Sequence, residues 1–321
     1  MRCPTLNDLP PPAGKTGWPW TEESARLPNT MADGSLWPRV SVVTPSYNTG
    51  QFIEATIRSV LLQGYPDVEY IIIDGASTDE SIAIIRQYES WLAYWVSEAD
   101  RGQSDAINKG IRQATGDIVF WINADDLCLP GAFTSAVNAF AHHSQPLLVV
   151  GQAWVIDESG QYLGTQRSRF TSWQDYATRQ CTIRQVSTFF KRSILVDAGL
   201  IDDSLHYTMD RELLLRLTST HPPYVITEPL AAFRQRSGQK FASNAIRGYR
   251  ESDMVAHRYL ASTPWLDSYR QWSALHWLGM AQEPSRTVGE RIRCLSYAIT
   301  QLPTIFLRKV FWTKVISKFT G

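Results

Sequence analysis

The sequence has no excess of charge of either sign, because 31 Lys and Arg residues balance 31 Asp and Glu residues among 321. A strongly basic balance would favour nucleic acid as a partner, and nothing of that kind is present. The four cysteines (Cys3, Cys128, Cys181, Cys294) are scattered and form no C-x-x-C pair. They therefore predict reduced thiols of a cytoplasmic protein, with no disulfide framework and no zinc site.

Long apolar runs are also missing. No run approaches the roughly 18 residues that a membrane-spanning helix needs, and the N-terminus lacks the charged-then-apolar pattern of a signal peptide. The six histidines include no i, i+4 pair that would suit a metal. With 44% hydrophobic and 19% charged residues, the composition is that of a folded globular protein. We expect a soluble, cytoplasmic chain with one large domain and a smaller appendage.

Residues 1–37 are rich in proline and turn formers, and we predict an N-terminal arm that lies on the surface. Gly14-Lys15-Thr16 resembles the end of a phosphate-binding P-loop. The glycine that such a loop needs five positions before Gly14 is Leu9, and no strand precedes it. A P-loop is therefore excluded.

From residue 38 the chain alternates between apolar strand-like runs and helical patterns. The predicted strands are Val40–Thr44 (ended by Pro45), Val68–Ile73, Trp95–Ser97 and Ile118–Ile122, and the predicted helices are 53–62, 81–88 and 105–114. Continuously apolar strands separated by helices are typical of an α/β protein with a mostly parallel sheet covered on both faces. In such sheets ligands bind at the carboxyl ends of the strands.

Acidic residues stand where that rule places a ligand. The apolar strand Ile118–Ile122 is followed closely by Asp125 and Asp126, two adjacent carboxylates that would repel each other and any anion. They make sense with Mg²⁺ or Mn²⁺ between them and a phosphate, because these cations take carboxylate oxygens plus substrate phosphates. The alternative is a solvated turn that caps the helix starting near Pro130.

The second half of the sequence is less regular. Residues 147–156 and 162–165 predict a hairpin, and 170–179, 193–198 and 209–218 predict helices. Residues 241–321 form a mostly helical extension. Its end (residues 303–321) is basic and aromatic, which suits either contact with an anionic membrane surface or a helix packed on the main domain.

Four motifs in order carry a family resemblance: Val42–Asn48, Ile73–Asp79, Gly102–Gly110 and Gly116–Asp126. They resemble glycosyltransferase family 2, whose members have the GT-A fold, and the resemblance covers residues 38–240. It implies that Thr44, Pro45, Tyr47, Asn48 and Asp74 hold the nucleoside. Many members carry a second acid after the first, where this chain has Gly75.

The resemblance also implies roles for the following residues. Asp105 and Asn108 would face the ribose or the donor sugar. The family's Asp-x-Asp metal motif has Asn123 at its first position here, which leaves Asp125, with Asp126 beside it, to bind Mn²⁺ or Mg²⁺.

An acid at the position of Asp210 is the general base of inverting members, since an acceptor hydroxyl must lose its proton as it attacks. Glu212 is the second candidate. The alternative for Asp210 is an acid that stabilises the helix N-terminus. Arg236 lies where members place a metal-binding histidine. Arg234 or Arg236 could clamp a diphosphate bidentately, or both could belong to a solvated basic loop.

We expect a metal-dependent inverting glycosyltransferase that takes a nucleotide-diphosphate sugar, a UDP-sugar in the first instance, and a saccharide or lipid-linked saccharide acceptor. Nucleic acid is not expected as a partner, and peripheral contact with the inner face of the membrane is the open question raised by residues 303–321. Two alternatives are a sugar-nucleotide-binding protein that has lost activity and a sugar nucleotidyltransferase. The second would need a glycine-rich basic loop after the first strand, and Thr49-Gly50 is too short for one.

Overall fold

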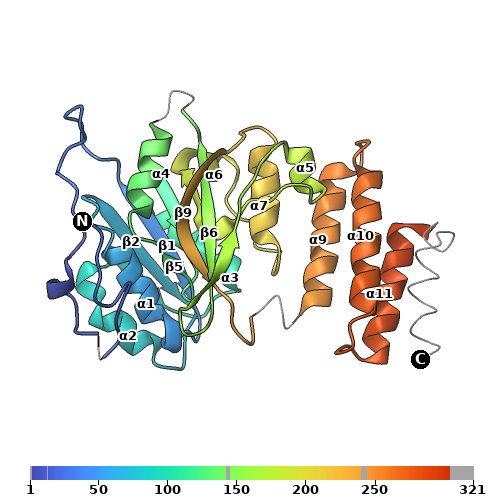
Figure 1. Ribbon diagram of the computed structural model, residues 1–321, viewed down its shortest axis with the longest axis horizontal. Helices are drawn as coiled ribbons and strands as arrows, with labels where there is room; N and C mark the ends of the chain where they lie inside the picture. The colour runs from blue at the N-terminus through green and yellow to red at the C-terminus, as the bar shows by residue number, and fades with distance from the viewer. Residues whose placement is uncertain (1, 13, 142–144, 240–243, 304–321) are drawn as a thin grey trace. The chain divides into compact units, whose positions relative to one another are not determined.

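A computed structural model describes residues 2–12, 14–141, 145–239 and 244–303 (Figure 1). The chain divides into two compact units. The first consists of Met1–Phe170 and Thr182–Ser243, and the second of Thr171–Cys181 with the chain from Asn244 onward. The C-terminal segment for which membrane contact was considered lies, from residue 304 onward, outside the described residues.

The described residues of the first unit form a nine-stranded sheet in the order β3-β2-β1-β4-β8-β6-β9-β5, with β7 paired to β6. The strands are β1 (Val40–Ser46), β2 (Val68–Asp74), β3 (Tyr94–Ser97), β4 (Ile118–Trp121), β5 (Leu127–Cys128), β6 (Leu148–Ile156), β7 (Tyr162–Gln166), β8 (Thr188–Lys191) and β9 (Tyr224–Arg234). The parallel arrangement predicted for the first four is confirmed. Beyond them the sheet is mixed, because β8 runs antiparallel to both β4 and β6.

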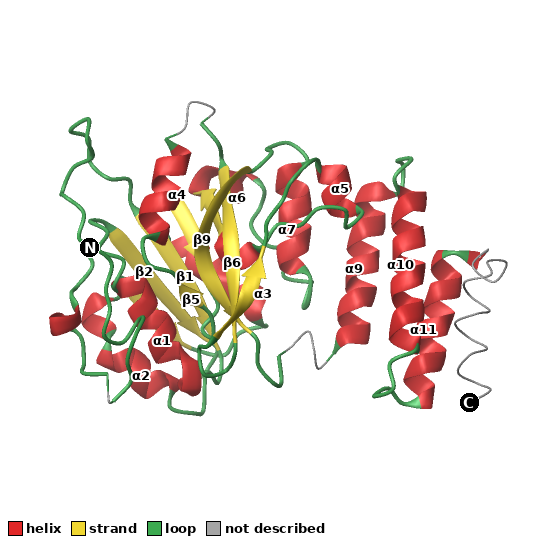
Figure 2. Ribbon diagram, in the orientation of Figure 1, coloured by secondary structure: helices red, strands yellow, loops and turns green. Residues whose placement is uncertain are grey.

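Helices cover both faces of this sheet (Figure 2). The helices of the first unit are α1 (Gly50–Leu61), α2 (Ser81–Gln87), α3 (Gln103–Gln113), α4 (Ala132–Phe140), α6 (Arg192–Asp197) and α7 (Met209–Thr218). Val42 of β1 packs in one core with Ile53 and Ile57 of α1. Val43 points to the other face, where a Cβ on Gly110 of α3 would lie 2.3 Å from its Cγ1 atom. Glycine at this position allows α3 to pack closely on the strand.

The prediction that Pro45 ends the first strand is wrong, because β1 continues to Ser46. The carbonyl of Ser46 accepts a hydrogen bond from Gly75, on the β2 side. Successive residues of a strand point their backbone groups to alternate sides, so the nitrogen of Pro45 points to the β4 side. The ladder with β4 has already ended at Trp121, and the missing N–H of proline costs no pairing there.

The N-terminal arm is joined to α1 by a buried arginine. Arg58 is 0% exposed and donates to the backbone carbonyls of Pro19 (3.0 Å), Pro10 (2.8 Å) and Trp20 (3.1 Å). The indole N–H of Trp18 donates to the carbonyl of Cys128, 2.8 Å away. The arm therefore satisfies polar groups inside the first unit.

The second unit contains α5 (Trp173–Ala177), α9 (Ala245–Leu260), α10 (Leu266–Ala281) and α11 (Val288–Gln301). The last three confirm the predicted helical extension over its described residues, 244–303. Its interior holds the Asp253 carboxylate, which accepts hydrogen bonds from Tyr269, Ser273 and Trp277 of α10. These neutral donors satisfy the buried carboxylate and fix α9 against α10.

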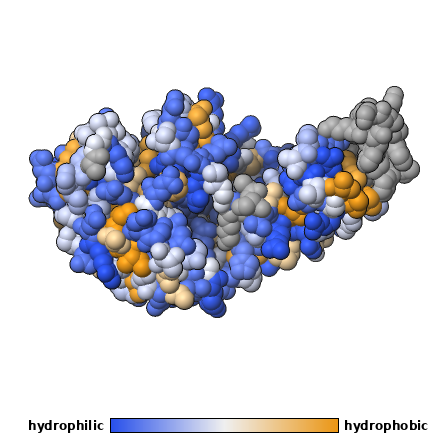
Figure 3. Space-filling view, turned by 90° about the horizontal axis from the view of Figure 1, so that it is seen from below, coloured by the Kyte–Doolittle hydropathy of each residue, from blue (hydrophilic) through white to orange (hydrophobic). Residues whose placement is uncertain are grey.

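Within the described ranges, no helix has the length and apolar character required to cross a bilayer. The face shown in Figure 3 is mainly hydrophilic, with hydrophobic residues in separate groups.

Candidate active site

A cavity of about 740 Å³ opens at the carboxyl ends of the parallel strands. Its size is in the usual range for small-molecule and cofactor sites. It is lined by Pro45, Ser46, Tyr47, Thr49, Gly75, Ala99, Asp100, Gly102, Gln103, Ala106, Asn123, Ala124, Asp125, Phe233, Arg236, Gly238 and Gln239. The segments that follow β1, β2, β3, β4 and β9 thus meet at one place, as expected for an open α/β sheet.

Five of the residues selected from the sequence line this cavity: Pro45, Tyr47, Asn123, Asp125 and Arg236. Tyr47 is 64% exposed, which makes its ring available for stacking. The other four come from the ends of β1, β4 and β9. The cavity therefore joins an aromatic ring, a carboxylate and a guanidinium.

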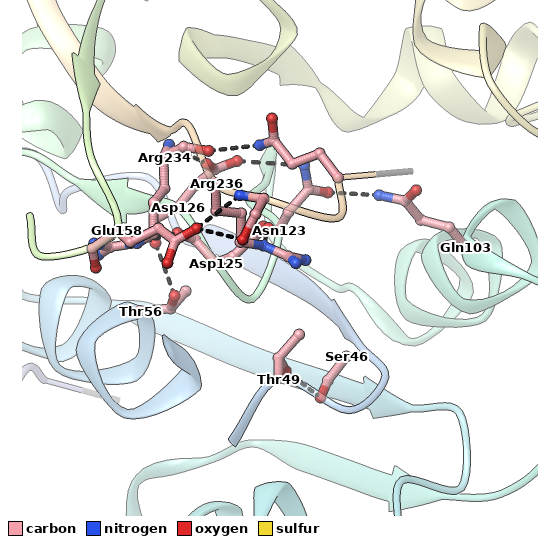
Figure 4. Close-up of polar contacts among 12 residues, drawn as sticks. Ser46, Thr49, Thr56, Gln103, Asn123, Asp125, Asp126, Glu158, Arg234 and Arg236 are labelled. Atoms are coloured by element: carbon pink, nitrogen blue, oxygen red, sulfur yellow. Dashed lines mark hydrogen bonds and ion pairs between the residues drawn. The ribbon is translucent and has the colours of Figure 1, made fainter. Parts of the chain in front are cut away.

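The adjacent carboxylates have different surroundings (Figure 4). Asp125 lines the cavity, and its Oδ2 accepts a hydrogen bond from Nε of Arg236 at 2.7 Å. Asp126 is 1% exposed and accepts the backbone N–H of Arg234 (2.9 Å) and the Asn123 amide (3.3 Å). Burial, and then the neighbouring Asp125, raise the pKa of Asp126 well above its ordinary value. Of the two acids, Asp125 is the one presented to a ligand.

The two arginines after β9 also differ. Arg234 is 4% exposed, and its guanidinium donates to the backbone carbonyls of Asp125, Asp157 and Glu158. Arg236 lines the cavity and pairs with Asp125. Both guanidinium groups lie over the ring of Phe52, at 5.2 and 5.4 Å from its centre. Arg234 therefore fixes loops, whereas Arg236 faces the space where a ligand would bind.

The loop that carries Arg236 is tied to the turn between β6 and β7. Ser237 donates both its backbone N–H and its hydroxyl to Oε1 of Glu158, at 2.7 and 2.8 Å. The side-chain oxygen Oδ1 of Asn123 accepts a hydrogen bond from the side-chain amide of Gln103 at 2.8 Å. These contacts hold the polar wall of the cavity in place.

Asp74 lies at the end of β2 as predicted, but its carboxylate is turned into the protein. It is 0% exposed and accepts four hydrogen bonds, from Ser46 (3.0 Å), from the backbone and hydroxyl of Ser77 (2.9 and 2.6 Å) and from Ser97 (2.7 Å). These bonds join the ends of β1, β2 and β3. In this structure Asp74 positions the strand ends that form the cavity.

Four more residues selected from the sequence do not line the cavity: Thr44, Asn48, Asp105 and Asn108. Asn108 both donates to and accepts from the backbone of Ile201. Asp105 accepts from Arg101, and this hydrogen bond and the arginine charge lower its pKa although burial opposes them. The side-chain oxygen of Asn48 accepts the backbone N–H of Thr78, and the hydroxyls of Thr44 and Tyr70 are hydrogen-bonded to each other. Each of these side chains supports the walls of the site.

The two acids of α7 are also distinct. Asp210 is half-buried in the first turn. Glu212 is 3% exposed and accepts two hydrogen bonds from Arg216, at 3.0 and 2.9 Å. The bidentate pair gives Glu212 a structural role, and Asp210 is the more accessible carboxylate.

Sequence reasoning assigned no role to several residues of the cavity, including Asp100, Gln103 and Phe233. Asp100 lies just before the motif Gly102–Gly110, and Gln103 lies within it. Their position after the third strand was therefore a signal in the sequence that they could line a ligand site. Phe233 and Gly238 belong to β9 and the loop after it, a strand that the sequence did not predict.

The donor set of the site fits a divalent cation only in part. Within the described part of the chain, no three His, Cys, Asp or Glu side chains could together hold a metal. Mg²⁺ commonly binds through one or two carboxylates together with substrate phosphates. Asp125 fits the role of a single protein carboxylate, while Asp126 is occupied by its own hydrogen bonds. The site suits a cation that a bound diphosphate helps to hold.

Comparison with known proteins defines the family. The model of "Glycosyl transferase family 2" matches residues 41–205, a span that contains Tyr47, Asp74, Asp100 and Asp125. The chain belongs to glycosyltransferase family 2. It is an enzyme of the glycosyltransferase class, as predicted.

Relatives of this family 2 chain support the assignment. It is 32% identical over 202 residues to an uncharacterised glycosyltransferase of Mycobacterium tuberculosis, covering 61% of this chain and 75% of that protein. It is 41% identical over 92 residues to TuaG of Bacillus subtilis, a putative teichuronic acid biosynthesis glycosyltransferase, covering 28% of this chain and 36% of TuaG.

Solved structures show the GT-A fold. Residues 1–349 of TarS from S. aureus, in complex with UDP-GlcNAc, match with a TM-score of 0.64 at 16% identity, over 83% of this chain and 82% of that one. The mannosyltransferase PcManGT from Pyrobaculum calidifontis, in complex with GDP-Man and Mn²⁺, matches with a TM-score of 0.52 at 16% identity, over 92% of this chain and 83% of that one. The expected GT-A fold with a helical C-terminal part is confirmed.

Proposed function

We propose that this family 2 enzyme transfers a sugar, with inversion, from a nucleotide-diphosphate sugar to a saccharide or lipid-linked saccharide acceptor, and that a divalent cation assists it. A UDP-sugar is the proposed donor. The observation that carries the proposal is the cavity at the strand ends, which combines Tyr47 with the Asp125–Arg236 pair. A nucleotide-diphosphate sugar presents a base to stack and a diphosphate to neutralise, and these residues suit both.

The binding of the nucleotide follows from the chemistry of the lining. The exposed ring of Tyr47 offers a face for the base. Arg236 offers a guanidinium whose planar fork matches phosphate oxygens. The structures of TarS with UDP-GlcNAc and of PcManGT with GDP-Man support a nucleotide-sugar ligand for this fold.

The cation would be held by Asp125 together with the diphosphate, and when bound it supplies Lewis-acid compensation of the charge on the leaving group. Arg236 lies beside the same carboxylate and adds a second positive group. Asp126 and Arg234 are buried outside the cavity lining, and their hydrogen bonds hold the segment that carries Asp125 in place. The Mn²⁺ in the PcManGT complex supports the proposal of a metal.

Proton removal from the acceptor requires a base within hydrogen-bond reach of its hydroxyl. We assign this role to Asp210, whose carboxylate is more accessible than that of Glu212. A base on the acceptor side is what a single displacement with inversion at the anomeric carbon needs.

Calorimetric titration tests the donor site. UDP, GDP and dTDP would each be added to the wild type and to Asp125→Ala, with and without Mn²⁺. We expect one nucleotide to bind in a metal-dependent manner and this binding to be lost in Asp125→Ala. The control is Asp203→Ala, at a surface carboxylate that pairs with Arg101 and does not line the cavity. If no nucleotide binds under either condition, the proposal is wrong.

A further inference from the structure

Gly75 and Asp100 share one small volume of the cavity wall. A Cβ built on Gly75 would lie 2.7 Å from Oδ2 of Asp100 and 3.2 Å from its Cγ. Two non-bonded carbon and oxygen atoms do not approach this closely, so the carboxylate of Asp100 occupies the space that any side chain at position 75 would need. The absence of a side chain on Gly75 is what allows Asp100 to lie there.

The orientation of Asp100 is fixed by its own loop. Its Oδ1 accepts the backbone N–H of Gly102 at 2.8 Å. The backbone N–H of Gly75 is bonded to Ser46 at 2.8 Å, so the glycine cannot move away from the carboxylate without breaking the pairing of β1 with β2. Oδ2 is therefore held toward Gly75, at the surface of the cavity that both residues line.

The same wall contains the ring of Tyr47. Its Cδ2 atom lies 3.4 Å from the Cβ position of Gly75, so the ring and the Asp100 carboxylate flank one glycine. Asp74, the acid next to Gly75, is fully buried and saturated with four hydrogen bonds. Asp100 is thus the carboxylate that this side of the cavity presents to a ligand.

We infer that Asp100 binds a hydrogen-bond donor of the nucleoside, either a ribose hydroxyl or a ring N–H of the base, and helps to set which nucleotide the enzyme accepts. This inference rests on the proposed nucleotide-sugar donor. A carboxylate repels phosphate but accepts strongly from neutral N–H and O–H groups. In the strand order β3-β2-β1-β4, Asp100 follows β3 and the Asp125–Arg236 pair lies beyond β1, on the other side. The nucleoside therefore binds at Tyr47, Gly75 and Asp100, and the diphosphate lies toward Arg236.

Two substitutions act on the same carboxylate in different ways. Asp100→Asn keeps the shape and an oxygen for Gly102 while removing the charge. Gly75→Ala leaves Asp100 in the chain but displaces its carboxylate by the added methyl group. The φ angle of Gly75 lies outside the left-handed region, so alanine is compatible with the backbone. Because both changes remove one interaction, the double variant should lose no more affinity than either single variant.

The experiment measures the dissociation constants of UDP, 2′-deoxy-UDP and N3-methyl-UDP in Mn²⁺ for the wild type, both single variants and the double variant. We expect each single variant to bind UDP about tenfold more weakly, a loss typical of a hydrogen bond to a charged group. The variants should also no longer distinguish UDP from one analogue: the deoxy analogue if Asp100 holds the ribose, the methyl analogue if it holds the base. Asp203→Asn, outside the cavity, is the matched control and should bind as the wild type does.

The outcomes separate this inference from the proposed function. If the wild type binds UDP and Asp100→Asn and Gly75→Ala bind it within twofold of the wild type, the role of Asp100 is wrong while the donor site stands. Additive losses in the double variant would also overturn it, since they would mean that the two substitutions act on different interactions. If the wild type binds no nucleoside diphosphate in calorimetry, both proposals fall together.

Discussion

Nε of Arg236 lies 2.7 Å from Oδ2 of Asp125, so a guanidinium of the protein itself is paired with the carboxylate that faces the cavity. A divalent cation that uses Asp125 must share this carboxylate with Arg236 or displace it. Under the proposed function the arginine would have two partners, the carboxylate and the diphosphate of the donor, and the balance between them would set how strongly donor binding depends on metal.

Substitution of Arg236 is expected to separate these two effects. In Arg236→Ala, UDP should bind about tenfold more weakly without metal, because a charged hydrogen-bond donor is lost. The Mn²⁺ concentration that gives half-maximal UDP binding should fall, since Asp125 no longer pairs with a protein cation. Arg236→Lys retains the charge without the planar fork and should be intermediate. Calorimetry measures both quantities, and unchanged values for Arg236→Ala would show that the ion pair has neither role.

Arg234 is expected to act on stability. Its side chain is almost completely buried and bonds to three backbone carbonyls, which Arg234→Ala would leave without donors beside two carboxylates. We expect a loss of about 3 kcal/mol in the free energy of unfolding, the scale on which breaking a buried charged interaction destabilises proteins. Urea denaturation measures it, and the half-buried Arg236→Ala is the control. Equal stability of the two variants would contradict the division of roles between the arginines.

The assignment of Asp210 as the base predicts a selective effect on rate. Asp210→Asn should lower turnover by about 10²- to 10⁴-fold, the usual contribution of a general base, and leave the dissociation constant of the nucleotide unchanged. Glu212→Gln should mainly lower the melting temperature, because it weakens the bidentate pair with Arg216. Turnover of each variant with its donor and acceptor, together with thermal melting, tests both. A Glu212→Gln variant that melts like the wild type but is inactive would reverse the assignment.

His276 predicts a pH dependence of the helical second unit. Its ring stacks on Trp272 at 5.2 Å, and among the described residues its Nε2 has no hydrogen-bond partner. Burial, and then the charge of Arg179, lower its pKa below the ordinary value. The folded chain therefore keeps the ring neutral at a pH where the unfolded chain takes up a proton, near pH 6.5 and below. Stability should fall as the pH is lowered from 7.5 to 5.5.

Urea denaturation of the wild type and of His276→Phe at both pH values provides the measurement. Phenylalanine preserves the stacking and cannot titrate, so the variant should lose less stability on acidification than the wild type. His221→Phe, at a histidine of the first unit, serves as the control for removal of a titratable ring. An equal loss in the wild type and in His276→Phe would assign the effect to other groups.

The sequence predicted most of the parallel half of the sheet, because each strand there is a continuous apolar run that alternates with a helix. It did not predict β9, in which Pro229 interrupts an otherwise β-forming run. The structure accommodates this proline at an irregularity, since the pairing of β9 with β6 changes register on both sides of Gln152. The two-residue strand β5 is too short for any periodicity to show.

The sequence indicated which residues line the cavity where position at a strand end is enough to place them there, as for Tyr47, Asn123 and Asp125. The direction of a side chain was not predictable. Asp74 stands at a strand end, yet three neighbouring serines turn its carboxylate inward. The pairing of Gly75 with Asp100 joins two different strand ends, and only the folded chain brings them together.

The hydrogen bonds of Arg58 have a practical consequence for anyone who shortens this protein. A chain that began at β1 would keep the guanidinium of Arg58 on α1 and would lose the three carbonyls of Pro10, Pro19 and Trp20 that accept its hydrogen bonds. Water would have to reach a position that is now fully covered, or the helix would have to move. The N-terminal arm, which looks dispensable in the sequence, thus takes the place of water around a guanidinium of the first unit, and removing it should destabilise that unit.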